Sequence, residues 1–167
     1  MKIKLILPIL ILAMLLFGCI GAQDDSKSFS QFSALKTKYY LTEGFSSNNA
    51  TMNDYISDLS ALRTKTAGSS QKVLDAEIYS ARTFFELSKA VSQSAQINFT
   101  PIKCSSIEVK NTILSLNNAF ADFENAQKAL NALNEKELSY LRAGQKEMVA
   151  GYGEQITRMK KFFDEKC

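Results

Sequence analysis

Two stretches in the C-terminal part of the chain repeat apolar side chains at α-helical spacing, and they restrict the fold more than any other feature. In the segments 106–133 and 134–167, apolar residues recur every three or four positions, which places them along one side of a helix. The stripes consist of Val109, Ile113, Leu116, Phe120, Phe123 and Leu130, and then of Leu138, Leu141, Met148, Tyr152, Ile156, Met159 and Phe163. We predict two long helices folded into an antiparallel hairpin.

One register of this hairpin brings the two stripes together. Facing residues of antiparallel helices have residue numbers whose sum is nearly constant, and Val109 with Phe163 is the first of several apolar pairs that share one sum. Gln127 and Gln145 are the polar residues that interrupt the stripes, and they pair at the same sum. We therefore predict that these two glutamines hydrogen-bond to each other inside the hairpin.

The preceding part of the chain also indicates helices. Pro101 is the only proline after residue 8, and no run shows the strict alternation that is typical of a strand. The predicted helices are Ser26–Thr42, Thr51–Gly68 and Ser70–Ala95, with loops at 44–50 and 97–103. The expected fold is all-α: an up-and-down bundle of four-helix type, in which the loop at 44–50 splits one arm into two shorter helices.

The first nineteen residues have the build of a secretory signal. Lys2 and Lys4 precede the apolar run Leu5–Phe17, which is followed by Gly18 and Cys19. The ending Leu16-Phe17-Gly18-Cys19 resembles the prokaryotic lipobox, and this resemblance covers only the leader. It implies that residues 1–18 are removed and that Cys19 carries a lipid. The alternative is an uncleaved signal anchor, because the run to Ala22 is just long enough to span a bilayer.

The leader sets the predicted domain organisation and location. Residues 1–18 form the signal peptide, residues 19–26 the lipidated cysteine and a tether, and residues 27–167 a single helical domain. The protein is then expected at the cell membrane, held by its lipid and facing outside the cytoplasm, in the periplasm or at the cell surface.

The cysteine count agrees with this interpretation. Of three cysteines, lipidation of Cys19 leaves Cys104 and Cys167, which the hairpin register places beside each other. An oxidising compartment favours closing such a pair, so we predict a Cys104–Cys167 disulfide.

The composition excludes several function classes. The chain has no histidine, so catalytic triads and histidine-based metal sites cannot be built. Without Lys2 and Lys4, the 20 basic residues fall to 18 against 17 acidic ones, with no basic cluster suited to nucleic acid. We expect no catalytic residues, no metal, no cofactor and no nucleic-acid partner.

A strip of small residues marks a candidate contact surface. Ala143 and Gly144 recur seven residues later as Ala150 and Gly151, next to Tyr152. Glycine inside a helix costs about 1 kcal/mol relative to alanine, so a close neighbour should compensate. That neighbour is either another helix of the same bundle or a bound partner, with Tyr152 as an anchor.

Two glycosylation sequons occur on predicted loops, at Asn49 (Asn-Ala-Thr) and Asn98 (Asn-Phe-Thr). They matter only in an organism that glycosylates exported proteins.

These observations lead to two functional hypotheses. The first is a membrane-anchored interaction or accessory module that binds a protein partner without catalysis. The second is a receptor bundle that holds a small ligand between its helices. A buried polar cluster would favour the receptor, whereas an exposed apolar strip over a dry core would favour the module.

Overall fold

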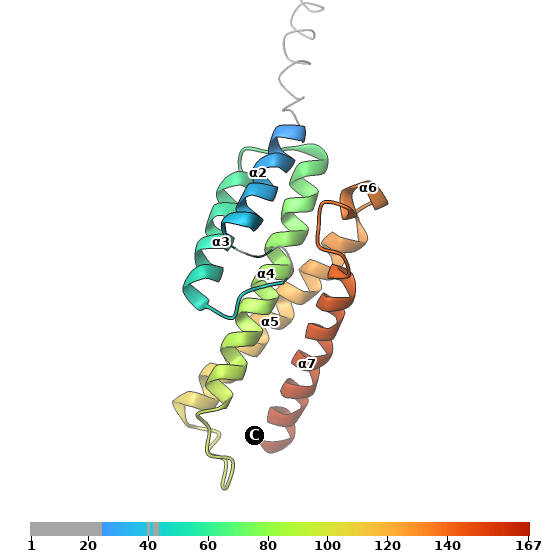
Figure 1. The fold of residues 1–167 in the computed structure, drawn as a ribbon. Helices are drawn as coiled ribbons and strands as arrows, with labels where there is room; N and C mark the ends of the chain where they lie inside the picture. Colours follow the sequence, from blue (N-terminus) through green and yellow to red (C-terminus); the bar gives the residue numbers. More distant parts are fainter. Residues whose placement is uncertain (1–24, 40, 42–43) are drawn as a thin grey trace, which may run out of the picture.

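The computed structural model describes residues 25–39, 41 and 44–167 (Figure 1). The predicted signal peptide and Cys19 lie outside the described residues. The helices are α2 (Asp25–Lys38), α3 (Asn49–Arg63), α4 (Gly68–Ser94), α5 (Ile107–Asn131), α6 (Glu135–Leu138) and α7 (Gln145–Lys166). Asp25, which we expected in the tether, already belongs to α2. Within the described ranges, no helix combines the length and the hydropathy needed to cross a membrane.

The long antiparallel pair α4 and α5 forms the spine of the molecule (Figure 1). Helix α7 packs along α5 and touches α4, while α2 and α3 cover the N-terminal half of α4. The half that contains α2 and α3 is therefore thicker than the opposite half, where only α4, α5 and α7 run together. The prediction of an all-α helical bundle is confirmed.

The predicted break near residues 44–50 separates α2 from α3. Asn48 caps α3, because its side-chain oxygen accepts a hydrogen bond from the Thr51 N–H at 3.1 Å. The two short helices lie side by side and antiparallel, and do not follow one another along a single arm. Accordingly, Lys38 at the end of α2 forms an ion pair with Asp58 of α3 at 2.8 Å.

Two groups of buried apolar side chains form the core, one in each half of the bundle. The group in the thicker half includes Phe32, Leu41, Met52, Tyr55, Leu59, Leu74, Ile78, Leu130, Leu141 and Val149. The group in the thinner half includes Leu87, Ala90, Val109, Leu116, Ala119, Ile156 and Phe163. Val109, Leu116, Ile156 and Phe163, which the predicted register pairs across the hairpin, all belong to this second group.

The prediction of one continuous helix from Asn134 to the C-terminus is wrong. Asn134 and Glu137 form a reciprocal capping box, but α6 ends at Leu138 and a turn follows. Helix α7 starts only at Gln145, after Gly144 with φ of 71° in the left-handed region that favours glycine. Capping signals mark where a helix starts, and they do not fix how far it continues.

The predicted Gln127–Gln145 hydrogen bond is also wrong. Gln127 is exposed on α5, whereas Gln145 is buried and donates to Glu77 of α4 at 2.8 Å. The turn before α7 shifts the start of that helix away from the continuous register, so the two glutamines do not face each other.

Helix α5 approaches α7 closely at Gly153 and not at Gly151. A Cβ atom on Gly153 would overlap the ring of Phe123 from α5, whereas a Cβ on Gly151 would meet no described atom within 4 Å. Of the two neighbours considered for Gly151, a helix of the same bundle or a bound partner, the first is therefore not found among the described residues, and the small residue that internal packing requires is Gly153.

This difference gives a matched pair of substitutions. Gly153→Ala is expected to lower the free energy of unfolding by about 1–3 kcal/mol, because Phe123 must move. Gly151→Ala should leave it unchanged or raise it by up to ~1 kcal/mol, because alanine is the better helix former. Denaturant unfolding of both variants measures the difference, and equal stabilities would contradict the packing of α7 on α5.

Candidate functional site

An apolar pocket lies at the thinner end of the bundle, close to the disulfide. It has a volume of about 520 Å³ and is lined by Ser94, Phe99, Arg158, Met159, Phe162 and Phe163. Phe99 and Phe162 remain 47% and 39% exposed, and their rings meet edge to face with centroids 5.7 Å apart. Adjacent exposed aromatic rings around an apolar hollow are typical of a binding surface.

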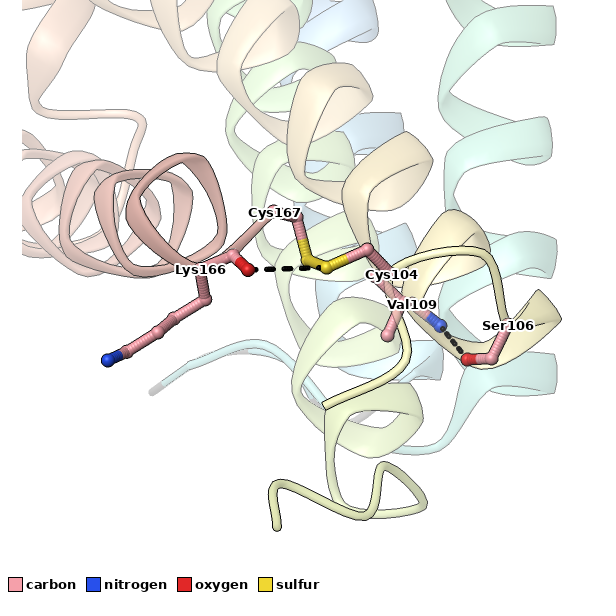
Figure 2. Close-up of a disulfide and its surroundings, with 5 residues drawn as sticks. All are labelled: Cys104, Ser106, Val109, Lys166 and Cys167. Carbon is pink, nitrogen blue, oxygen red and sulfur yellow. Dashed lines mark hydrogen bonds between the residues drawn. A yellow bond between two sulfur atoms is a disulfide. The ribbon is translucent and has the colours of Figure 1, made fainter. Parts of the chain in front are cut away.

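The Cys104–Cys167 disulfide holds this end together, as the sequence predicted (Figure 2). It joins the C-terminus of α7 to the turn before α5, where Ser106 caps the helix by accepting from the Val109 N–H at 3.3 Å. Cys104 Sγ also lies 3.3 Å from the Lys166 carbonyl oxygen; a disulfide sulfur carries no hydrogen, so this is a close contact and not a hydrogen bond. The aromatic end of α7 is thereby fixed against α5.

One exposed side of α7 leads from this pocket toward the middle of the bundle. We call it the α7 strip, and it consists of Gly151, Gln155, Arg158 and Phe162. Their spacing of four, three and four residues places them on one side of the helix. Arg158 and Phe162 also line the pocket, and among the described lining residues Arg158 is the only charged one.

The structure brings together only part of the small-residue surface that the sequence suggested. Ala143 and Gly144 are exposed in the turn before α7, not on a helix. Ala150 and Gly151 are exposed on α7, but consecutive helical residues point about 100° apart, so only Gly151 belongs to the α7 strip.

Tyr152 faces the bundle and is not an exposed anchor. It is half-buried, and its ring centroid lies 5.5 Å from that of Phe84, which in turn contacts Phe45. Burial raises the pKa of Tyr152 to about 12, so the phenol stays neutral at ordinary pH. Its main contribution is to packing between α4 and α7.

Both sequons lie on the surface. Asn49 is the exposed first residue of α3. Asn98 is exposed in the loop after α4, where its side-chain oxygen accepts a hydrogen bond from the Thr100 N–H at 3.0 Å.

A buried polar cluster lies in the thicker half of the bundle, and the sequence patterns did not reveal it. Arg142, in the turn before α7, forms an ion pair with Glu77 of α4 at 2.7 Å, and both side chains are at most 3% exposed. Tyr55 donates to the same carboxylate at 2.6 Å and Gln145 donates to it at 2.8 Å. Arg142 Nε donates to the Leu41 carbonyl at 2.7 Å.

Most of the hydrogen-bonding groups in this cluster bind one another. Glu77 accepts through both carboxylate oxygens, and burial together with this carboxylate raises the pKa of the Tyr55 phenol. The Arg142 guanidinium also lies over the Phe45 ring, 4.1 Å from its centroid. Through these bonds the cluster connects α3, α4 and the start of α7, and Arg142 Nη2 is its one buried polar atom that has no hydrogen-bond partner among the described residues.

A second hollow, of about 390 Å³, is lined by residues of α3, α4 and α5. Its lining residues are Asn53, Ile56, Arg82, Phe85, Glu86, Asn118, Ala121 and Asp122. Burial, and secondarily the neighbouring Glu86, raise the pKa of the Asp122 carboxyl, while Arg82 opposes the shift. Because the basic Arg82 and the acidic Glu86 and Asp122 line this cleft, it is the place where the small-ligand hypothesis would have to be tested.

Phe99 was the pocket residue hardest to find from the sequence. It lies in the loop after α4, outside every helical stripe, and only its exposure next to Phe162 shows its role. Arg142 was missed because it lies outside the apolar stripe of the predicted continuous helix, and only its contacts in the folded chain show its role.

The part of the chain with assigned positions contains no group of three or more histidine, cysteine, aspartate or glutamate residues that could hold a metal ion. No family model, no curated protein and no solved structure matches this chain.

Proposed function

We propose that this protein is a lipid-anchored, extracytoplasmic interaction module that binds a helical segment of another protein chain without catalysis. The observation that carries the proposal is the apolar pocket between the ends of α4 and α7, with Phe99 and Phe162 exposed beside it. The α7 strip extends from this pocket along a helix, and an elongated surface of that kind suits a helix better than a compact solute.

A receptor for a small ligand has less support. Small-ligand sites combine an apolar lining with several convergent polar groups, and Arg158 is the only charged residue at the pocket. The buried cluster around Glu77 supplies polar groups, but most of them already bind one another, and Arg142, whose Nη2 has no partner, does not line the apolar pocket.

The position of the pocket fits the proposed anchoring. The N-terminal end of α2 lies at the opposite end of the bundle from the C-terminus, where Cys167 forms the disulfide (Figure 1). The 27 residues of α4 correspond to about 40 Å at the helical rise, so a lipid on Cys19 would leave the pocket pointing away from the membrane.

The test uses the full chain in its native membrane. A photo-crosslinking phenylalanine analogue is placed at Phe162, and in a matched variant at Leu114, which is exposed on α5 at 59%. Crosslinking to a protein from position 162, and much less from position 114, is the expected result. Equal crosslinking at both positions, or none, would overturn the proposal.

The same preparation tests the anchor. Intact mass should show a chain that begins at Cys19 and carries acyl groups. A chain that retains residues 1–18 and has no acyl mass would show that the anchor is wrong, while leaving the pocket's role open to the crosslinking result.

A further inference from the structure

Exposed lysines gather at the end of the bundle where α2 begins. The end of α3, the start of α4, the end of α5 and the short α6 lie at the same end, opposite the C-terminus (Figure 1). Two contacts join these elements: the Ser70 N–H of α4 donates to Asp25 Oδ1 at 3.3 Å, and Lys72 Nζ lies 3.8 Å from Glu137 Oε1. We call this surface the lysine end, and its exposed basic residues are Lys27, Lys65, Lys72, Lys128 and Lys136.

The acids at the lysine end are fewer, and two of them are bound within the fold. The Asp25 carboxylate accepts the hydrogen bond from α4. Glu137 is only 4% exposed, and its Oε2 accepts from the Asn134 N–H at 2.9 Å. Glu135 is exposed, and Asp24 precedes α2 in the sequence. Lysine ammonium groups therefore outnumber the carboxylates at this surface.

Among the described residues, the lysine end exposes no large apolar side chain. Those that are exposed lie in the other half of the molecule, and they are Val91, Phe99, Ile107, Leu114 and Phe162. The core of a protein–protein interface is apolar and rich in aromatic residues, whereas lipid headgroups are polar and charged. The lysine end therefore suits headgroups better than a protein.

The length of the preceding segment limits how far this end can lie from a membrane. Six residues, Cys19 to Asp24, precede Asp25, and they span at most about 20 Å. A helix with its side chains is about 10 Å wide, so a lipid on Cys19 keeps the lysine end within two helix widths of the bilayer. A signal anchor retained up to Ala22 would hold it closer still.

We propose that the lysine end docks on anionic lipid headgroups of the membrane that holds the anchor, so that the bundle stands upright. This inference rests on the anchoring in the proposed function and adds the surface and the lipid class that orient the domain. Lysines near an anionic bilayer are attracted to it over about 10 Å at 0.1 M salt. Because the anchor supplies a high local concentration, a few lysines are enough to select this orientation.

The test measures how fast each lysine reacts in vesicles. The full chain, purified from its native membrane, is reconstituted in phosphatidylcholine alone or with about one third phosphatidylglycerol, and is treated briefly with a water-soluble amine-acylating reagent. Peptide mass spectrometry should show labelling at the lysine end about threefold slower or more in the anionic vesicles. Lys103 and Lys110, exposed at the opposite end, should react equally in both. At 1 M salt the difference should disappear, because the screening length falls to about 3 Å.

A pair of matched variants tests the charges themselves. Lys65 and Lys136 are exposed and form no side-chain ion pair among the described residues. Lys65→Glu combined with Lys136→Glu should return the labelling of Lys27 and Lys72 in anionic vesicles to the rate seen in phosphatidylcholine. Lys103→Glu combined with Lys110→Glu should leave the protection of the lysine end intact.

Three results would overturn the inference. The first is equal labelling of the lysine end in both kinds of vesicle, and the second is an equal fall at both ends of the bundle, which indicates unspecific adsorption. The third is protection in native membranes but not in anionic vesicles, which shows that a protein covers the lysine end.

This proposal and the proposed function fail in different ways. If the lysines do not respond to anionic lipid while position 162 captures a protein, the interaction module stands and the docking surface is wrong. If the lysines respond and position 162 captures nothing, the docking surface stands and the proposed binding of a protein chain is wrong. A chain that does not associate with either kind of vesicle overturns both the anchor and the docking surface.

Discussion

Arg142→Met is expected to lower the free energy of unfolding by about 3–5 kcal/mol. The substitution removes the guanidinium that lies 2.7 Å from Glu77 and leaves a carboxylate that is fully buried without its charged partner. It also leaves the Leu41 carbonyl without the Arg142 Nε–H that reaches it at 2.7 Å. Denaturant unfolding followed by circular dichroism measures the loss.

Two controls separate the buried charge from a general effect of losing an arginine. Arg63 forms a comparable 2.8 Å ion pair with Asp75, but the two side chains are 43% and 30% exposed. Arg63→Met should therefore cost at most about 1 kcal/mol. Adding Glu77→Leu to Arg142→Met should recover part of the loss, because no buried charge then remains. Equal losses for the two arginine variants would contradict the importance of burial.

The buried cluster also explains why the start of α7 could not be predicted from apolar spacing. The stripe of the predicted helix continued from Leu138 through Leu141, and nothing in that spacing marks a turn. In the turn that follows α6, Arg142 reaches both Glu77 and the Leu41 carbonyl, and these are tertiary contacts that apolar spacing does not record. Gly144 permits the turn through its positive φ, but glycine alone does not distinguish a turn from close helix packing.

The helices of the thinner half could be predicted because the spacing of their apolar residues agrees with their tertiary contacts. The stripes of α5 and α7 have a regular period, and the disulfide fixes their relative position at one end. The fold class and the cysteine pair therefore followed from the sequence. The pocket did not, because Phe99 reaches it from a loop and the period of a helix carries no information about a loop side chain.

Replacing both Cys104 and Cys167 by serine should lower the free energy of unfolding by about 4 kcal/mol, if the disulfide acts by restricting the entropy of the unfolded chain. The two cysteines are 63 residues apart, and a crosslink across so long a segment removes much of the freedom of the unfolded chain. Replacing both residues avoids leaving a reactive thiol. The measurement is denaturant unfolding of the double variant against the oxidised parent, with the reduced parent as a second reference that should match the variant.

The same substitution should act locally on the binding surface. Without the crosslink, the last turn of α7 is held by backbone hydrogen bonds such as Cys167 N–H to the Phe163 carbonyl at 2.8 Å and by burial of Phe163. Amide hydrogen exchange should therefore accelerate most in residues 160–167, beyond the change that global destabilisation causes in the centre of α4. Because Phe162 and Phe163 line the pocket, crosslinking from position 162 should fall in the same variant. Unchanged exchange at the end of α7 would show that core packing, and not the disulfide, positions the aromatic end of this helix.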